Sequence, residues 1–170
     1  MVKYDKPLEK GGFKMATSNI ENSVKESIAA FNARNIDLFL SGFTNDCVYE
    51  DNALGKVNNG REELRNFIKD MFAWSPDVKL EIKALFTVGK WVGQEWIMSG
   101  THTGSTPELP ATGKKFSIRG ASISELRDGK VSRNTDYWNM AAFLQQIGIL
   151  PASTIPNRFG RFMMRLMMKR

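Results

Sequence analysis

The sequence predicts one α+β domain in which helices come first and an antiparallel sheet follows. Apolar residues recur at the helical period of about 3.6 residues as far as Ala73, and they alternate with polar residues from Val78 onward. Asp128-Gly129 joins two of the alternating segments and is a typical hairpin turn. Helices followed by a run of strands are characteristic of α+β proteins, whereas a regular alternation of the two would indicate a parallel α/β sheet.

The first helix is expected to follow a flexible arm. Residues 1–18 are predicted to form this arm, because Pro7 and Gly11-Gly12 disfavour regular structure. Ser18 followed by Glu21 is a capping-box pattern, which predicts that a helix begins there. The helix would bury one apolar face, made of Ile20, Val24, Ile28 and Phe31.

The remaining elements follow from the same patterns. Before the sheet we expect a short helix at 35–43 that buries Leu38 and Phe39, a strand at 47–50, a loop at 51–60 and a helix at 61–73. The sheet would contain strands at 78–82, 91–103, 115–126 and 130–138, with a loop at 104–113. A last short helix, 139–147, would end at Gly148, with Pro151 beyond it.

The composition and the distribution of charge exclude several classes of protein. With 42% apolar and 25% charged residues, the chain resembles an ordinary globular protein and not a disordered one. The net charge of +6 resides at the two ends, since residues 158–170 hold five basic and no acidic residues, and residues 1–14 hold four lysines and two acids. The rest is close to neutral and lacks the dense basic surface that nucleic-acid backbones require.

Cysteine and histidine are scarce. Cys47 is the single cysteine and His102 the single histidine, which excludes an internal disulfide and a zinc site of Cys and His ligands. No apolar run approaches the ~20 residues that cross a bilayer, and residues 1–14 lack the apolar stretch of a signal peptide. The expected localisation is therefore cytoplasmic.

Strand parity places the candidate site residues on one face of the sheet, because alternate side chains of a strand point the same way. Three strands contribute to this set: Trp96, Met98 and His102 from the strand at 91–103, Asn134, Asp136 and Trp138 from the strand at 130–138, and Tyr49 and Asp51 from the strand that begins at 47. If the three faces converge, they form an aromatic, apolar pocket with few ionisable groups.

Asp136 is the candidate acid/base residue of this pocket. A carboxylate held against tryptophan is poorly solvated, which raises its pKa toward the neutral range in which proton abstraction and return are efficient. Tyr49, Asp51 and His102 would orient a substrate oxygen, and Trp96, Met98, Trp138 and Asn134 would contact the substrate. In the alternative interpretation Asp136 is a hydrogen-bonded structural carboxylate, His102 bonds to backbone, and Tyr49 and the tryptophans are core residues.

The C-terminal tail, 151–170, forms a separate feature. As a helix it would place Phe159, Phe162, Met163, Leu166 and Met167 on one face and Arg161, Arg165 and Lys169 on another. A cationic amphipathic helix can lie on an anionic membrane surface, which predicts a weak membrane-surface contact. The alternative is a terminal helix that covers the sheet, or the mouth of the pocket in a dimer mate.

Several short motifs resemble the SnoaL-like polyketide cyclases of the nuclear transport factor 2-like superfamily. They are Gly100-Thr101-His102-Thr103-Gly104, Thr112-Gly113-Lys114, Arg119-Gly120, Asp128-Gly129-Lys130-Val131, Asp136-Tyr137-Trp138-Asn139 and the segment from Phe143 to Gly148. The resemblance covers about residues 19–150. It implies a domain at 19–150 with a strongly curved sheet wrapped around helices, a cone-shaped pocket and a homodimer.

The resemblance also implies an activity. In SnoaL-like cyclases an aspartate of the last strand, here Asp136, shuttles a proton during an intramolecular aldol closure, without metal or cofactor. Asn139 occupies the position of a second aspartate in many relatives. The chain is also similar to limonene epoxide hydrolases at Asp136, Tyr49 and Asp51, but Trp96 and Met98 replace their Arg and second Asp, so epoxide hydrolysis is not predicted.

Two functional hypotheses follow. The first is a cofactor-independent general acid/base enzyme, a polyketide cyclase-like lyase or an isomerase, that acts on a small apolar carbonyl compound. The second is a non-catalytic module of the same fold that binds a small apolar ligand or a protein partner. Asp136 distinguishes them, because its substitution would abolish turnover in the first case and change only stability in the second.

Overall fold

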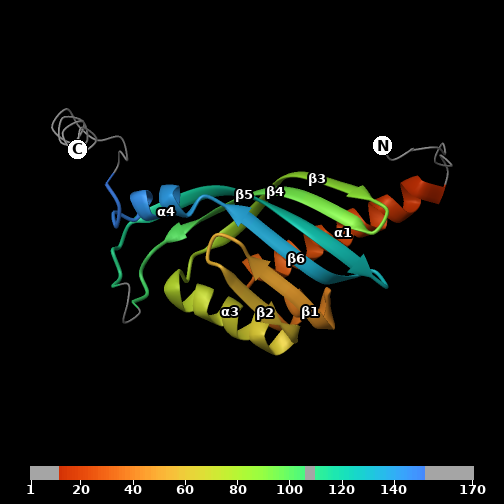
Figure 1. The fold of residues 1–170 in the computed structure, drawn as a ribbon, viewed down its shortest axis with the longest axis horizontal. Coiled ribbons are helices and arrows are strands. Elements are labelled where there is room, and N and C mark those ends of the chain that lie inside the picture. Colours follow the sequence, from red (N-terminus) through yellow and green to blue (C-terminus); the bar gives the residue numbers. More distant parts are fainter. Residues whose placement is uncertain (1–11, 106–109, 152–170) are drawn as a thin grey trace, which may run out of the picture.

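The structure is a computed structural model that describes residues 12–105 and 110–151. The described elements, in chain order, are α1 (Gly12–Asn32), α2 (Ile36–Ser41), β1 (Phe43–Asp51), β2 (Lys56–Asn59), α3 (Gly60–Trp74), β3 (Lys79–Val88), β4 (Trp91–Thr101), β5 (Lys115–Arg127), β6 (Lys130–Trp138) and α4 (Met140–Gln146) (Figure 1). Three of the four helices precede the run of four strands from β3 to β6, as the periodicity predicted, while β1 and β2 lie between α2 and α3. The α+β class is confirmed.

The strands form one curved six-stranded sheet in the order β2-β1-β6-β5-β4-β3. The pairing of β1 with β6 is parallel, and the other neighbouring pairs are antiparallel. The sheet is therefore mixed and larger than the pattern indicated. The sixth strand, β2, lies inside the predicted loop, and its exposed polar residues lack the alternation by which a strand is recognised from sequence.

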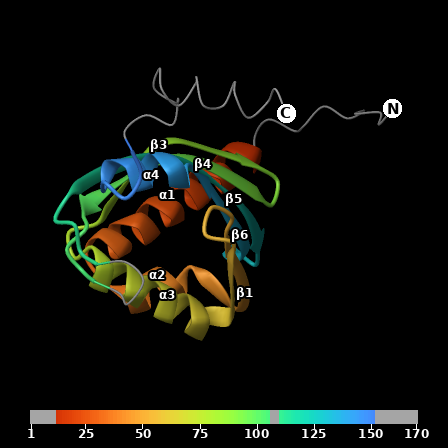
Figure 2. The same cartoon turned by 60° about the vertical axis from the view of Figure 1, so that its left-hand side comes forward.

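The sheet curves around α1, which lies across its concave face (Figure 2). Asn32 at the end of α1 fixes this arrangement by pairing with the backbone of edge strand β3. Its Nδ2 donates to the Leu80 carbonyl and its Oδ1 accepts from the Leu80 N–H, both at 2.8 Å. The helix α3 packs against β1 and β2 and contributes to the same hydrophobic core as α1.

The core lies between the helices and the concave face. It includes Phe31 of α1, Leu40 of α2, Leu64 and Ile68 of α3, and Trp96, Phe116 and Ile118 of the sheet. The helical residues recur at the spacing that the sequence predicted for buried faces. Burial of this apolar set supplies most of the stabilisation of the fold.

Asparagine side chains cap the N-termini of two short helices. Asn35 Oδ1 accepts from the Leu38 N–H at 3.0 Å at the start of α2, and Asn139 Oδ1 accepts from the Ala142 N–H at 2.9 Å at the start of α4. Each bond satisfies a backbone donor that has no partner within its helix. Asn139 therefore caps α4.

Two local predictions are wrong. The helix α1 begins at Gly12, six residues before the start that the Ser18 capping box predicted. Leu38 is 54% exposed, whereas Phe39 is buried as predicted, since α2 is too short to bury more than one side. The remainder of the predicted arm, 1–11, and the tail, 152–170, lie outside the described residues.

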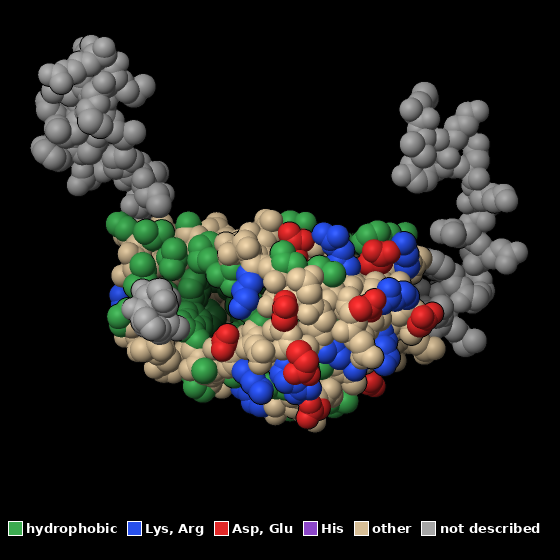
Figure 3. All heavy atoms as spheres, turned by 60° about the horizontal axis from the view of Figure 1, so that its bottom comes forward, with side chains coloured by type: hydrophobic (Ala, Val, Ile, Leu, Met, Phe, Trp, Pro, Cys, Tyr) green, Lys and Arg blue, Asp and Glu red, His purple; other side chains and the backbone are tan. Residues whose placement is uncertain are grey.

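The surface around α3, β1 and β2 carries acidic and basic side chains in alternation, and apolar side chains gather around a hollow at the end near α4 (Figure 3). Opposite charges interspersed in this way favour solubility and give no single-sign field over this face. None of the described helices combines the length and apolar character needed to cross a membrane.

Candidate functional site

The carboxylate of Asp136 lies on the concave face of β6 and is 8% exposed. It accepts hydrogen bonds from three side chains. Ser122 Oγ donates to Oδ1 at 2.5 Å, Asn134 Nδ2 donates to Oδ1 at 2.7 Å, and the Tyr49 hydroxyl donates to Oδ2. The donors reach it from both neighbouring strands and from β6 itself, so the sheet register determines the environment of this group.

Trp96 extends the network by one bond. Its Nε1 donates to Ser122 Oγ at 2.8 Å, and the same hydroxyl donates onward to Asp136. The indole lies over Gly120, where a Cβ atom would lie 2.2 Å from its Cη2. Glycine is therefore required opposite Trp96 for the indole to reach the serine.

Burial is the main influence on the ionisation of Asp136. It raises the pKa of this carboxyl group above its ordinary value, because the charged form loses its hydration. The bonds from Ser122, Tyr49 and Asn134 lower the pKa, and the nearby charge of Asp51 raises it; the net direction is upward. Burial and the neighbouring Asp136 raise the pKa of Tyr49 well above its ordinary value, so the phenol keeps its proton.

A cavity of about 110 Å³ lies between α1 and the concave face, and Asp136 lines it. Most of its polar wall comes from the sheet: Gln94, Ser122, Ser124, Asn134 and Asp136. Much of its apolar wall comes from α1 and from the region around α2: Ile20, Val24, Ile28, Phe39 and Phe43. The described residues that line it include no Lys, Arg or His, so the cavity suits a neutral molecule with an apolar body and a polar edge.

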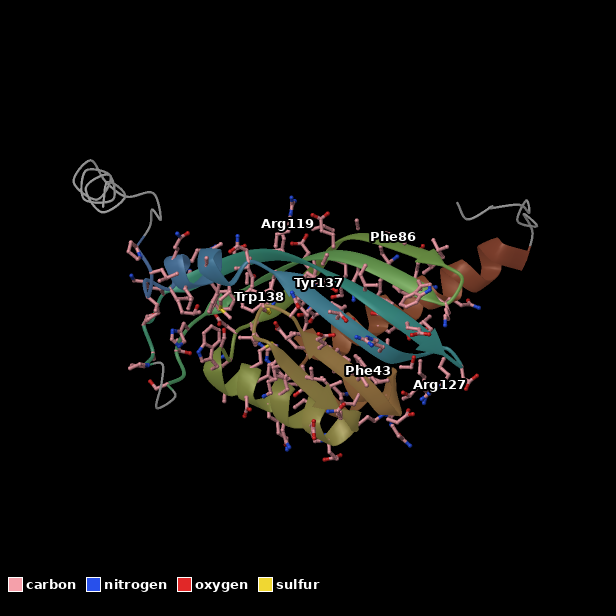
Figure 4. The ribbon with its side chains drawn as sticks, viewed as in Figure 1. Phe43, Phe86, Arg119, Arg127, Tyr137 and Trp138 are labelled. Atoms are coloured by element: carbon pink, nitrogen blue, oxygen red, sulfur yellow. The ribbon has the colours of Figure 1, made fainter. Side chains whose placement is uncertain are left out.

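The cavity lies toward one end of the sheet. Phe43, which lines it, and Arg127 lie at the end of the sheet that carries the β5–β6 hairpin, whereas Trp138 lies at the other end, near α4 (Figure 4). Residues 20–28 of α1 cover the Phe43 end, as the lining of the cavity shows. Strand parity groups side chains by face but cannot tell which of them share one end of the sheet.

The predicted site residues divide into two sets. Asp136, Tyr49, Trp96 and Asn134 come together at the cavity. Asp51, His102, Met98 and Trp138 are not among its lining residues. Met98 is half-buried and packs against the hydrophobic core.

Asp51 and Trp138 pair with each other beside the cavity. Trp138 Nε1 donates to both carboxylate oxygens of Asp51 at 3.0 Å, and the Leu54 N–H donates to Oδ1 at 2.9 Å. Asp51 is opposite Asp136 in the parallel pairing of β1 with β6. It acts on Asp136 through its charge, and the structure gives it no direct bond to that carboxylate.

His102 is buried beyond β4, at the far end of the sheet. Its Nδ1 lies 3.1 Å from Thr112 Oγ1, and its ring lies against Trp74 with 4.4 Å between the ring centroids. Burial lowers its pKa, which favours the neutral imidazole. The ring nitrogen Nδ1 therefore contacts a side-chain hydroxyl and not the backbone, and Nε2 is buried without a partner among the described residues.

Three polar sheet residues of the cavity wall were missed from sequence. Ser122 and Ser124 point the same way as Phe116 and Ile118 of their strand, and Gln94 points the same way as Trp96. A polar residue that alternates in phase with buried apolar residues is the signal that would have found them. The described residues hold no group of three or more His, Cys, Asp or Glu that could bind a metal ion.

Known proteins resemble this chain in sequence and in fold. The family model described as SnoaL-like polyketide cyclase matches residues 22–147. Among curated proteins, cyclase aurE of Calcarisporium arbuscula is 31% identical over 126 residues, which are 71% of this chain and 90% of that protein. Aklanonic acid methyl ester cyclase DauD of Streptomyces sp. (strain C5) is 29% identical over 77 residues, 45% of this chain and 48% of that protein.

Solved structures agree with the fold. TsrD from Streptomyces laurentii has a TM-score of 0.70 at 20% identity, over 85% of this chain and 100% of that chain. A protein of ketosteroid isomerase-like fold from Catenulispora acidiphila DSM 44928 has a TM-score of 0.66 at 25% identity, over 79% of this chain and 97% of that chain. The likeness to TsrD concerns the fold alone, whereas the family model covers most of the chain. The chain therefore belongs to the SnoaL-like polyketide cyclase family.

Proposed function

We propose that the protein is a cofactor-independent cyclase that closes a ring in a small, neutral carbonyl compound by general acid/base chemistry, with Asp136 as the residue that moves the proton. The observation that carries this proposal is a buried carboxylate of raised pKa at the wall of a largely apolar cavity. Such a group is a stronger base than a solvated carboxylate, and its conjugate acid can return the proton near neutral pH. The cyclase names of the curated relatives support this choice.

The chemistry is an intramolecular aldol addition. The Asp136 carboxylate removes a proton from the carbon next to a carbonyl group, which leaves an enolate. The enolate carbon forms a C–C bond with a second carbonyl carbon of the same molecule, and the oxygen of that carbonyl becomes an alkoxide. The alkoxide takes the proton back from the Asp136 carboxyl group, so the step is an isomerisation that balances without an external reactant.

The groups around Asp136 hold its carboxylate in place and leave one oxygen able to accept a proton. Tyr49 stays protonated and donates to Oδ2, while Ser122 and Asn134 occupy Oδ1. A carboxylate oxygen has two lone pairs, so Oδ2 retains one that can accept a proton. Asp51 contributes through its charge, which opposes ionisation of Asp136 and thereby strengthens it as a base.

The proposal is tested by proton exchange on α-tetralone, a bicyclic ketone with an enolisable carbon. Wild-type protein in D2O should accelerate deuterium incorporation at that carbon, followed by proton NMR. Asp136→Asn should lower the rate by about 10²- to 10⁴-fold, the usual contribution of a general base. Asp128→Asn, in the exposed β5–β6 turn, serves as the control and should leave the rate unchanged.

Equal rates in wild type and Asp136→Asn would overturn the proposal. Combined with undiminished binding of a bicyclic ligand, they would support the second hypothesis, a non-catalytic ligand-binding module in which Asp136 is structural. The three hydrogen bonds to this carboxylate are compatible with that role, so the exchange rate is the deciding measurement.

We also propose that the protein forms a homodimer through the outer, convex face of the sheet. Phe86, Ile123 and Tyr137 are 58%, 42% and 48% exposed there, and Phe86 lies across Gly93, where a Cβ atom would collide with its ring. An apolar patch over neighbouring strands marks an interaction surface. Arg119 projects from the same face (Figure 4) beside Glu95, at 3.0 Å, so both charges are available to a twofold-related copy.

A further inference from the structure

The side chain of Gln94 carries a polar atom for which the described part of the chain supplies no partner. Gln94 lines the cavity, and its Oε1 is buried and accepts no hydrogen bond from any described residue. A buried amide oxygen without a partner costs free energy that an apolar side chain of the same shape would not cost. A residue of this kind in a cavity wall indicates a bond that forms only when the cavity is occupied.

The other polar side chains of the same wall are already engaged. Ser122 accepts from Trp96 and donates to Asp136. Asn134 accepts from Ser124 Oγ at 2.7 Å and donates to Asp136. Each of these bonds joins one wall residue to another. Gln94 is therefore the residue of this wall that can still accept a hydrogen bond from a ligand.

The position of Gln94 relative to Asp136 follows from the strand register. Gln94 of β4 is opposite Ser122 of β5, which in turn is opposite Asp136 of β6. Two strand spacings separate the Cα atoms of Gln94 and Asp136 by roughly 10 Å. A ligand oxygen held by Gln94 is therefore attached to a different carbon from the one that approaches Asp136.

We propose that Gln94 is a specificity-determining residue that binds a hydroxyl group of the substrate, on a carbon remote from the one that Asp136 deprotonates. A hydroxyl group suits this position because it donates to Oε1, and rotation of the amide by 180° would let it accept from Nε2 instead. The substrate class is then a hydroxylated, neutral carbonyl compound. This inference rests on the proposed function for the identity of the reacting carbon, but the binding step itself does not depend on catalysis.

The test compares two ligands of equal size that differ in one group, 2-naphthol and 2-methylnaphthalene. Affinities are measured by titration calorimetry for wild type, Gln94→Leu and Gln94→Met, with Gln145→Leu in α4 as the control. Wild type and the control should prefer the naphthol by about fivefold, the effect of one net hydrogen bond. Both Gln94 variants should lose that preference while binding the methyl compound at least as tightly.

A second readout separates binding from a structural role. Because Oε1 has no partner in the free protein, both Gln94 variants should melt at the same temperature as wild type or higher. A lower melting temperature, or a preference for the naphthol that survives in both variants, would overturn the inference. Wild type that binds the two compounds equally would overturn it as well.

The Asp136→Asn variant distinguishes a failure of this inference from a failure of the proposed function. If Gln94 binds the hydroxyl group, the preference for the naphthol persists in Asp136→Asn even though proton exchange is lost. A preference that disappears in Asp136→Asn and persists in Gln94→Leu would mean that the hydroxyl group binds Asp136, and it would refute the inference alone. Unchanged proton exchange in Asp136→Asn would instead refute the proposed function, whatever the affinities.

Discussion

The hydroxyl of Tyr49 donates a hydrogen bond to the carboxylate of Asp136 across the parallel pairing of β1 with β6. Tyr49 is opposite Asn134 in that register, two residues before Asp136, so the long phenol side chain reaches diagonally to the carboxylate. The bond lowers the pKa of Asp136 against the effect of burial. Tyr49 therefore tunes the proposed base.

Tyr49→Phe should move the acidic limb of the pH–rate profile to higher pH. The variant loses one of the three bonds that stabilise the ionised carboxylate, so the pKa of Asp136 rises and a higher pH is needed to deprotonate the base. The measurement is α-tetralone exchange as a function of pH. Tyr137→Phe on the outer face is the control, and an unshifted limb in Tyr49→Phe would contradict the assignment.

The stability of wild type relative to Asp136→Asn should fall as pH rises. The pKa of Asp136 is higher in the folded state than its ordinary value of 3.8, so the folded protein holds this proton more tightly than the unfolded chain. Its contribution is favourable at low pH and is lost as pH rises from about 4 through the raised folded pKa. Urea unfolding of both proteins across this range checks the sign, and a difference that grows with pH would refute it.

Ser122→Ala should change the pKa of Asp136 more than Ser124→Ala does, although both variants remove a buried hydroxyl group. Ser122→Ala removes a bond to Asp136 and leaves the Trp96 N–H without its acceptor, which should destabilise the fold by about 1–3 kcal/mol and raise the pKa of Asp136. Ser124→Ala removes a bond to Asn134 and affects Asp136 only indirectly. A carboxyl NMR titration of Asp136 measures both shifts; equal shifts would contradict the network.

Trp138→Phe should reduce stability without reducing ligand affinity. The variant removes the donor to both oxygens of buried Asp51, which should cost about 1–3 kcal/mol in the free energy of unfolding. Trp138 does not line the cavity, so the affinity for 2-naphthol should stay within about twofold. A loss of more than about tenfold would restore Trp138 to the substrate-binding role that the sequence predicted.

Ile123→Lys should convert the proposed dimer to a monomer. The charge would lie in the middle of the apolar patch on the convex face, where a second copy would desolvate it. Sedimentation velocity measures the change, and Lys130→Glu at the exposed start of β6 is a control that should keep the assembly of wild type. Wild type that sediments as a monomer at high concentration would refute the dimer.

Most of the elements were predictable because their signals are local. The β5–β6 hairpin follows from Asp128-Gly129, and β6 occupies the predicted span, 130–138. The short strand β2 and the true start of α1 were missed, since the first carries no apolar alternation and the second precedes the capping signal. The parallel pairing of β1 with β6 was also missed, because no local pattern specifies which strand lies beside which.

The sequence by itself determined that Asp136, Asn134 and Trp96 face the helices, because the alternation of side chains along a strand depends only on the residues within that strand. Tertiary structure decided which of these residues meet. The register places Ser122 and Tyr49 on either side of Asp136 and leaves Trp138 with Asp51, while the curvature of the sheet and the position of α1 put the cavity at one end and His102 at the other. Register and curvature arise from long-range pairing and packing, which join residues that are as far apart in the chain as Tyr49 and Asp136.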